Sequence, residues 1–252
     1  MQRKVYIIFI LILFGKSSLA LTRGDVQIIE ARENIQYLGQ KITTDYFLLY
    51  KRPNDLILKN KFQKNIKEIE KNIKNIENTT QNHITLNILN FYQYRLEYIK
   101  ELPLEEPKEN DAKIILAASN YFLEGAISIA KQHQYISSKE ETMLIHCKEL
   151  KYLVESVSKY YMAFQIGLRE SSHDIEMQQA IQAINKNLKN ISDYHYPYRL
   201  KKKLEKIKRI WKHNQLLFKN LKEARFTNLL LSSNSYLKTL LIDLERYHKQ
   251  NL

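Results

Sequence analysis

Histidine, cysteine and the carboxylates are the side chains of this sequence that could carry chemistry, and their spacing fits no catalytic or metal site. His146 and Cys147 are adjacent, so they point about 100° apart on a helix and make a poor shared metal site. The other histidines show no HExxH or similar ligand spacing; they are His83, His133, His173, His195, His213 and His248. The sequence also lacks a Gly-rich phosphate loop and a G-x-S-x-G motif. We therefore expect no metal, no cofactor and no enzymatic activity.

The elements that must position these side chains are long helices. The chain has only five glycines and four prolines, too few for a turn-rich β fold. Apolar residues recur at alternating spacings of four and three, which places them on one stripe of a helix; in the second half they are Met143, Cys147, Leu150, Val154, Val157, Tyr161, Phe164 and Leu168. Cys147 lies on this stripe and is expected to be a buried thiol. Carboxylates such as Glu140, Glu141, Glu149 and Glu155 are expected on solvated helix faces.

A tandem repeat organises the helices. KNIKNIE at 71–77 and KNLKNIS at 186–192 align at an offset of 115 positions, and two further segments keep the same offset. IQYLGQKITTDYFLLY (35–50) falls on LKYLVESVSKYYMAFQ (150–165), and IILAASNYFLEGAISI (114–129) falls on LLLSSNSYLKTLLIDL (229–244). We interpret this as a duplication with copies at 21–136 and 137–252. In KNIKNIE we expect the lysines and asparagines to face solvent, while Ile73 and Ile76 pack in the bundle.

Helix-breaking and capping residues predict four helices in each copy. Pro53 to Asp55, the polar stretch 78–81, and Pro103 with Pro107 separate the helices of the first copy. Residues 170–174 and Pro197 do the same in the second copy, and Ser138 with Glu141 offers a capping box at the junction. The predicted fold is all-α: two tandem antiparallel four-helix bundles, about eight long helices in total.

The N-terminus has the pattern of a signal peptide. Arg3 and Lys4 precede the apolar run VYIIFILILFG (5–15), and Ser18-Leu19-Ala20 has the small-x-small pattern of a cleavage site. Eleven apolar residues span about 16 Å as a helix, too short for a bilayer core of about 30 Å. We expect residues 1–20 to be removed on export to the periplasm, with an uncleaved membrane anchor as the alternative.

Positive charge is concentrated in the second copy. The formal net charge is +13, and eight cations face one acid, Glu205, in RLKKKLEKIKRIWK; they are Arg199, Lys201, Lys202, Lys203, Lys206, Lys208, Arg209 and Lys212. Such a run is either an ordinary solvated helix face or a surface that attracts anionic lipid headgroups, cell-wall polymers or an acidic protein. The export signal argues against nucleic acid. The adjoining tyrosines of DYHYPYR (193–199) either cap the bundle or form a recognition patch.

LGQKITTDYFLLY (38–50) resembles a known motif. Leu38, Gln40, Lys41, Ile42, Tyr46 and Phe47 are similar to the first-helix motif of the N-terminal sensor domain of type IV pili methyl-accepting chemotaxis transducers (PilJ-type), which is related to the NarX-like nitrate-sensor input. Leu153, Lys159, Tyr160 and Tyr161 match it more loosely in the second copy, and LAASNYFLEGA (116–126) resembles the fourth helix of that family. The resemblance implies an extracytoplasmic helical bundle whose first helix helps to bind a small ligand.

The resemblance also suggests where a ligand binds. An arginine of the nitrate-sensor motif contacts an anion, and the matching positions here are Gln36 and Lys151, so only the second copy keeps a cation. Gln40 and Glu155 are further candidate ligand contacts.

We therefore expect a sensor-like protein that binds a small anionic or polar ligand, or a membrane-bound chemotaxis or two-component transducer. The alternative is an adaptor that docks its basic face on an anionic envelope surface or acidic partner. The sequence leaves the ligand, the partner and the oligomeric state open, and does not decide whether the bundles stack end to end or side by side.

Overall fold

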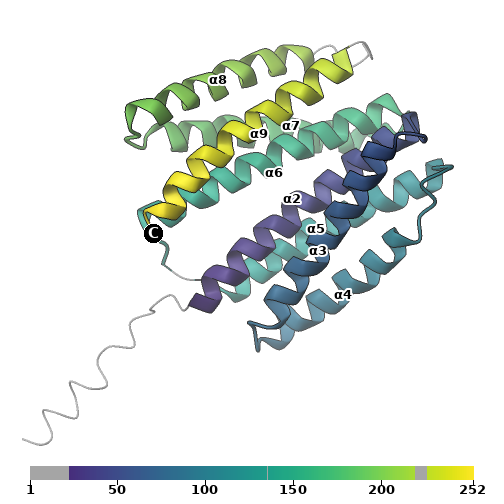
Figure 1. The fold of residues 1–252 in the computed structure, drawn as a ribbon, viewed down its shortest axis with the longest axis horizontal. Helices are drawn as coiled ribbons and strands as arrows, with labels where there is room; N and C mark the ends of the chain where they lie inside the picture. Colours follow the sequence, from purple (N-terminus) through teal and green to yellow (C-terminus); the bar gives the residue numbers. More distant parts are fainter. Residues whose placement is uncertain (1–22, 135, 219–225) are drawn as a thin grey trace, which may run out of the picture.

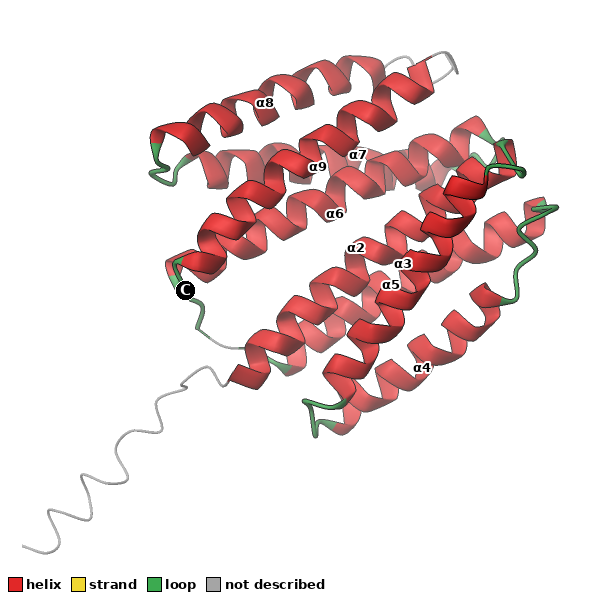
Figure 2. Ribbon diagram, in the orientation of Figure 1, coloured by secondary structure: helices red, strands yellow, loops and turns green. Residues whose placement is uncertain are grey.

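The computed structural model describes residues 23–134, 136–218 and 226–252, and this part of the chain is helical without strands (Figures 1 and 2). Eight helices follow one another: α2 (Arg23–Lys51), α3 (Leu56–Glu77), α4 (His83–Lys100), α5 (Glu109–Gln132), α6 (Lys139–Gln165), α7 (Ser171–Ser192), α8 (Tyr198–Phe218) and α9 (Thr227–Gln250). The all-α prediction is thus confirmed. The predicted signal peptide lies outside the described residues. Every described helix is too short or too polar to span a lipid bilayer.

Side-chain caps explain several helix starts. Asp55 and Asn82 accept hydrogen bonds from the backbone N–H groups of Leu58 and Thr85 at the starts of α3 and α4. Ser138 and Glu141 form the expected capping box, with both reciprocal bonds present at 3.1 and 2.7 Å.

One predicted break was misplaced. Residues 171–174 belong to α7, and α6 has already ended at Gln165. Gly167 explains the earlier end: its φ of 87° is left-handed, a conformation that glycine adopts without the steric cost of a Cβ.

The eight helices pack as two groups joined along their first members. α2 packs on α3 and α5, and α4 covers α3 and α5; α6 packs on α7 and α9, and α8 lies mainly on α9. α2 and α6 also pack on each other, so these two helices run side by side through the middle of the molecule (Figure 1). We call this contact the α2–α6 seam.

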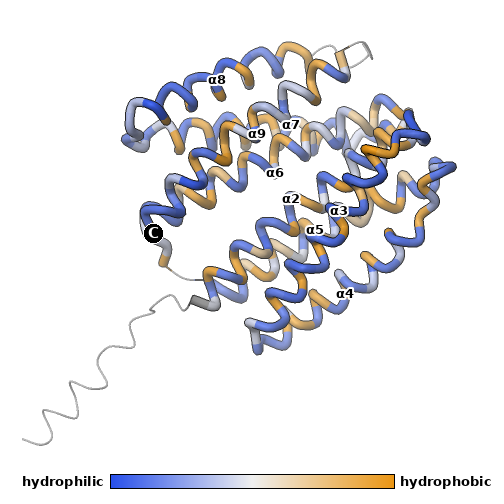
Figure 3. The backbone as a smooth tube through the Cα atoms, in the orientation of Figure 1, coloured by the Kyte–Doolittle hydropathy of each residue, from blue (hydrophilic) through white to orange (hydrophobic). Residues whose placement is uncertain are grey.

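The apolar stripes of all helices meet in one continuous core that extends across both groups. Orange apolar positions alternate with blue polar ones along the helices (Figure 3). Ile73, Ile76 and Cys147 are buried as expected, and Leu188, which lies 115 residues after Ile73, is buried as well. The inner stripe of α8 is also buried, with Leu204, Ile207, Trp211 and Phe218 facing the core.

The first asparagine of each repeated KN-x-KN motif corrects the expectation of solvent exposure, whereas Lys71, Lys74 and Asn75 are exposed as expected. Asn72 and Asn187, which are 115 residues apart, are both buried. Asn34 Nδ2 donates to Asn72 Oδ1 at 3.1 Å, and Asn187 is hydrogen-bonded to Glu149, the residue 115 positions after Asn34. These amides are buried because each links the second helix of its group to the first.

Candidate functional site

The four candidate ligand residues all lie on α2 and α6, at or near the seam. Gln36, Gln40 and Glu155 are buried, and Lys151 is partly buried. Glu155 therefore lies inside the molecule, which corrects its expected place on a solvated helix face. Gln40 Nε2 donates to the carbonyl oxygen of Ser119 on α5 at 3.2 Å. Each of the four is held by other side chains or backbone of the protein, and their ligand-binding role stays a prediction.

The contacts of Gln36 and Lys151 across the seam are reciprocal. Gln36 of α2 is hydrogen-bonded to Tyr152 of α6, while the Lys151 ammonium of α6 lies 5.6 Å from the ring centroid of Tyr37 on α2. Gln36 corresponds to Lys151, and Tyr37 to Tyr152, at the 115-residue offset. Exchange of partners of this kind is the pattern of a two-fold symmetric interface.

One side of the seam contains a buried ion-pair cluster, which we call the closed cluster: Lys41, Asp45, Glu155 and Lys238. Lys41 pairs with Asp45, and Lys238 of α9 pairs with Glu155. Asn65 Nδ2 of α3 donates to Asp45 Oδ2 at 2.8 Å. Burial raises the pKa of Glu155, but Lys238 and Lys41 outweigh it and hold this pKa below its usual value. The four charges balance one another, so the cluster is internally neutral.

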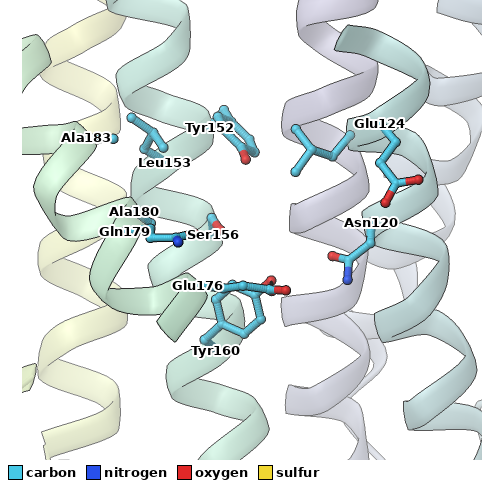
Figure 4. A pocket seen from close by; sticks show the side chains of 11 residues that line it. Asn120, Glu124, Tyr152, Leu153, Ser156, Tyr160, Glu176, Gln179, Ala180 and Ala183 are labelled. Carbon is cyan, nitrogen blue, oxygen red and sulfur yellow. Dashed lines mark hydrogen bonds between the residues drawn. The ribbon is translucent and has the colours of Figure 1, made fainter. Parts of the chain in front are cut away.

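The other side of the seam contains an open groove of about 360 Å³ between α5, α6 and α7 (Figure 4). We call it the α5–α7 groove. Tyr152, Ser156 and Tyr160 of α6 and Glu176 of α7 face Asn120 and Glu124 of α5 across it. Leu123, Leu153, Ala180 and Ala183 supply its apolar walls. The groove therefore combines two carboxylates, two tyrosines and a short apolar lining.

Lys159 lies directly behind this groove and is 1% exposed. Its Nζ donates to Ser119 Oγ at 3.0 Å, Asn120 Oδ1 at 3.2 Å and the Tyr160 hydroxyl at 3.0 Å. Tyr160 in turn donates to Glu176. Burial lowers the pKa of Lys159 from its usual 10.5 to about 7, although Glu176 acts in the opposite direction. A buried amine whose pKa is close to neutral pH is thus linked to the groove through Asn120 and Tyr160.

The sequence contained a signal for Lys159 that was not used for the site. Lys159 matched the family motif in the second copy, yet residue 44 at the corresponding place in the first copy is threonine. An internal repeat that places lysine where its partner has a buried threonine indicates a local change of chemistry. The carboxylates of the groove gave no comparable signal, because they come from separate helices.

The basic residues of α8 lie on the outside of the molecule, where the helix is largely blue in Figure 3. Six of them are exposed: Arg199, Lys201, Lys202, Lys206, Arg209 and Lys212. Lys203 pairs with Asp243, and Lys208 pairs with Glu205 at 3.1 Å. The apolar stripe faces the core, so α8 presents a mainly cationic surface to solvent.

The tyrosines beside α8 mostly serve packing. Tyr194 and Tyr196 pack with Tyr247 and His248 at the end of the second group, whereas Tyr198 is exposed. His248 lies 2.7 Å from the Tyr196 hydroxyl and 2.6 Å from Glu140 Oε2. The bundle-capping interpretation of DYHYPYR thus holds for two of its three tyrosines.

A matching cluster occurs in the first group. His133, which is 115 residues before His248, lies 3.7 Å from Asp25 and 3.0 Å from the Thr85 hydroxyl. Asp25 is likewise 115 residues before Glu140. We call these the first clasp (Asp25, His133, Thr85) and the second clasp (Glu140, His248, Tyr196). Each one ties the start of the first helix of its group to the end of the fourth.

Comparison with known proteins gives no family. No family model matches the chain, and neither a curated protein nor a solved structure is significantly similar to it. Within the described residues, no group of three or more His, Cys, Asp or Glu side chains is placed to hold a metal ion. The proposals below therefore rest on the residues and geometry of this chain.

Proposed function

We propose that this protein is an extracytoplasmic, sensor-like module that binds a small polar ligand beside the α2–α6 seam and passes the effect to a membrane-bound signalling partner. The observation that carries the proposal is the open α5–α7 groove, backed by the buried polar residues of the seam. A dry, closed core would have favoured a purely structural role. The signal-peptide pattern of residues 1–20 supports export, and the motif resemblance supports the sensor role.

The proposal includes two four-helix bundles that arose by duplication and pack side by side. The reciprocal contacts of Gln36 and Lys151 and the two clasps, all at the 115-residue offset, support it. A ligand in the groove would touch α5 of the first bundle and α6 and α7 of the second. Binding would act by changing how the two bundles pack on each other.

Thermal-shift measurements on the purified protein test the binding function. The compounds are nitrate, nitrite, amino acids, organic acids and small amines, each well above the dissociation constant expected of a physiological ligand. A ligand at about 100 times its dissociation constant stabilises the folded state by about 2.7 kcal/mol, a rise of roughly 5–10 °C in Tm. Lys151→Ala tests the anion site implied by the resemblance. If no compound of any class raises Tm, the proposed ligand-binding function is wrong.

A second function has support from α8. Its six exposed cations fit an adaptor that docks on an anionic envelope surface or an acidic partner. Co-sedimentation with anionic vesicles and with cell-wall sacculi tests it, using Lys201→Gln/Lys202→Gln/Lys206→Gln. The matched control is Lys61→Gln/Lys64→Gln/Lys67→Gln, which removes three exposed lysines from α3. Binding that survives about 0.3 M salt, or that both triple variants reduce equally, contradicts the docking function.

A further inference from the structure

The α5–α7 groove and the closed cluster are built from corresponding positions of the two halves. Three residues that line the groove have counterparts 115 positions away in or beside the closed cluster: Ser156 corresponds to Lys41, Leu123 to Lys238, and Tyr152 to Tyr37. The two places therefore share a backbone framework and differ in the side chains that fill it.

On the closed side, the space next to the tyrosine holds lysine side chains. Lys41 and Lys238 reach Asp45 and Glu155, and the Lys238 ammonium lies 5.7 Å from the ring centroid of Tyr37. Alkyl chains thus run along this space, and their ammonium groups end at carboxylates and an aromatic ring. Attraction of an ammonium to the face of a tyrosine is worth about 0.5–2 kcal/mol, depending on its desolvation.

On the groove side, the two lysines are replaced by shorter residues. Ser156 and Leu123 leave the space open, while Tyr152 keeps the aromatic ring. Glu124 and Glu176 place carboxylates along the groove (Figure 4). Leu123 and Leu153 give it apolar surface. The tyrosine is thus retained without the lysines, whereas Asp45 and Glu155 correspond to Tyr160 and Gln40. The carboxylates of the groove, Glu124 and Glu176, come from other positions.

We infer that the α5–α7 groove binds a small molecule with one or two alkylammonium groups, which takes the place that Lys41 and Lys238 fill on the other side of the seam. This inference rests on the proposed ligand-binding function and names its ligand class. Glu176 and Glu124 accept hydrogen bonds from the ammonium, Tyr152 contacts it through its ring, and the alkyl chain packs on Leu123 and Leu153. The ligand class is opposite in charge to the anion that the motif resemblance implies.

Isothermal titration calorimetry on the purified protein at constant ionic strength tests the ligand class. The probes are 1,4-diaminobutane and n-butylamine, compared with 1,4-butanediol and butyrate, which match them in length but are neutral or anionic. We expect the two amines to bind, with the diamine tighter, and the diol and butyrate to give no saturable heat.

Variants test the location. Ser156→Lys introduces into the groove the residue found at position 41, and we expect it to weaken diamine binding about tenfold or more. Glu176→Gln removes one ammonium partner and should also weaken binding about tenfold. Gln178→Lys is the matched control, because it adds the same charge at an exposed position of α7 outside the groove lining. It should change the affinity by no more than about twofold.

The outcomes separate this inference from the proposed function. Binding of butyrate or another anion in place of the amines overturns the ligand class and leaves the binding function intact. Amine binding that Ser156→Lys leaves unchanged, or that Gln178→Lys reduces equally, overturns the location. If none of the compounds in the wider thermal-shift panel binds either, the proposed function fails together with the inference.

Discussion

The two sides of the α2–α6 seam use corresponding backbone positions for opposite purposes. On one side Lys41 and Lys238 pair with Asp45 and Glu155 and fill the space between the helices. On the other side Ser156 and Leu123 leave a groove, and the buried cation is Lys159. Side chains 115 positions apart thus fill the space with balanced charges on one side of the seam and leave it open on the other.

The difference also separates stability from binding. A buried ion pair contributes little net stability to the folded state. Removing one partner nevertheless destabilises the protein strongly, because the other charge is then buried without either water or a counter-charge. On the groove side Glu124 is exposed and Glu176 is partly exposed, so these two carboxylates cost little to change. Variants on the closed side should therefore affect folding, and those on the groove side should affect ligand binding.

The largest expected effect is that of Glu155→Gln. Glu155 is 1% exposed, and its loss leaves Lys238 and Lys41 with Asp45 as the remaining carboxylate of the cluster. We expect the free energy of unfolding to fall by about 3–5 kcal/mol, which lowers Tm by roughly 10 °C. Urea denaturation monitored by circular dichroism measures it.

Glu176→Gln is the matched variant on the groove side and should cost less than about 1 kcal/mol. The pair replacement Glu155→Leu/Lys238→Leu should recover most of the stability lost in Glu155→Gln, because it leaves neither charge of that pair unpartnered. Equal losses for Glu155→Gln and Glu176→Gln would show that the two sides do not differ as described.

The two halves also differ in how they fill their cores. An ideal Cβ on Gly125 would lie 2.3 Å from the Tyr92 hydroxyl, so glycine is needed for this tyrosine to pack and to donate to the Phe122 carbonyl oxygen at 2.7 Å. At the corresponding positions the second half has Leu240 and Ile207, both buried. A glycine with a large aromatic partner in one half thus corresponds to two branched aliphatic residues in the other.

Gly125→Ala should lower the free energy of unfolding by about 2 kcal/mol, because the new methyl group displaces Tyr92 and strains its hydrogen bond. Gly125→Ala/Tyr92→Ile brings the first half toward the arrangement of the second. A double-mutant cycle by urea denaturation should then give a favourable coupling of at least about 1 kcal/mol. Simple additivity of the two single changes would mean that position 125 does not depend on Tyr92.

Local signals in the sequence predicted the helices well. Prolines and the Ser138–Glu141 box marked ends that the structure confirms, and apolar periodicity selected core residues such as Ile73 and Val154. The end of α6 was misplaced because its signal was a single left-handed glycine, Gly167, rather than a polar run. Asn72 was misjudged because polarity alone does not show that its amide has a partner on α2.

The candidate site was only partly predictable. The repeat and motif located Gln36, Gln40, Lys151 and Glu155 on the first helices, and these residues do lie at or near the seam. The repeat and the motif did not indicate that Glu155 pairs with Lys238, because these partners are 83 residues apart and charge complementarity has no sequence period. The groove was missed for a related reason: it is formed by the shortness of Ser156 and Leu123, and an unfilled volume has no residue of its own.

Lys159 gives an effect that depends on pH. Its pKa is about 7 in the folded protein and about 10.5 when unfolded, so between these values the unfolded chain binds the extra proton. Stability from this group is therefore lowest below pH 7 and rises with pH above it. Among the described residues, the charged side chain that acts on the Lys159 ammonium is Glu176 of α7. The other contacts of Lys159, on α5 and α6, are hydroxyl groups and an amide.

Lys159→Met should remove this rise, which amounts to about 1 kcal/mol per pH unit between pH 7 and 9. Urea denaturation of both proteins at pH 6, 7, 8 and 9 measures it, with Lys212→Met as the control at an exposed position of α8. Parallel pH profiles for the wild type and Lys159→Met would show that Lys159 does not change its protonation on unfolding in this range.

The smallest expected effect distinguishes the two clasps. His248 is fully buried among Tyr194, Tyr196 and Tyr247, whereas His133 stays in part exposed. Burial lowers the pKa of His248, and its contact with Glu140 only partly offsets this. The unfolded chain therefore takes up the proton first, and the second clasp loses stability as the pH falls below about 6.5.

His248→Gln should accordingly reduce the loss of Tm between pH 7.5 and 5.5 by roughly 2–4 °C, equivalent to about 1 kcal/mol. His213→Gln, which removes an exposed histidine from α8, should follow the wild-type profile. His133→Gln completes the comparison. If it reduces the loss of Tm as much as His248→Gln does, the deeper burial of His248 does not make the second clasp more sensitive to acid. If His248→Gln instead keeps the wild-type slope, the acid sensitivity between pH 7.5 and 5.5 does not come from the second clasp.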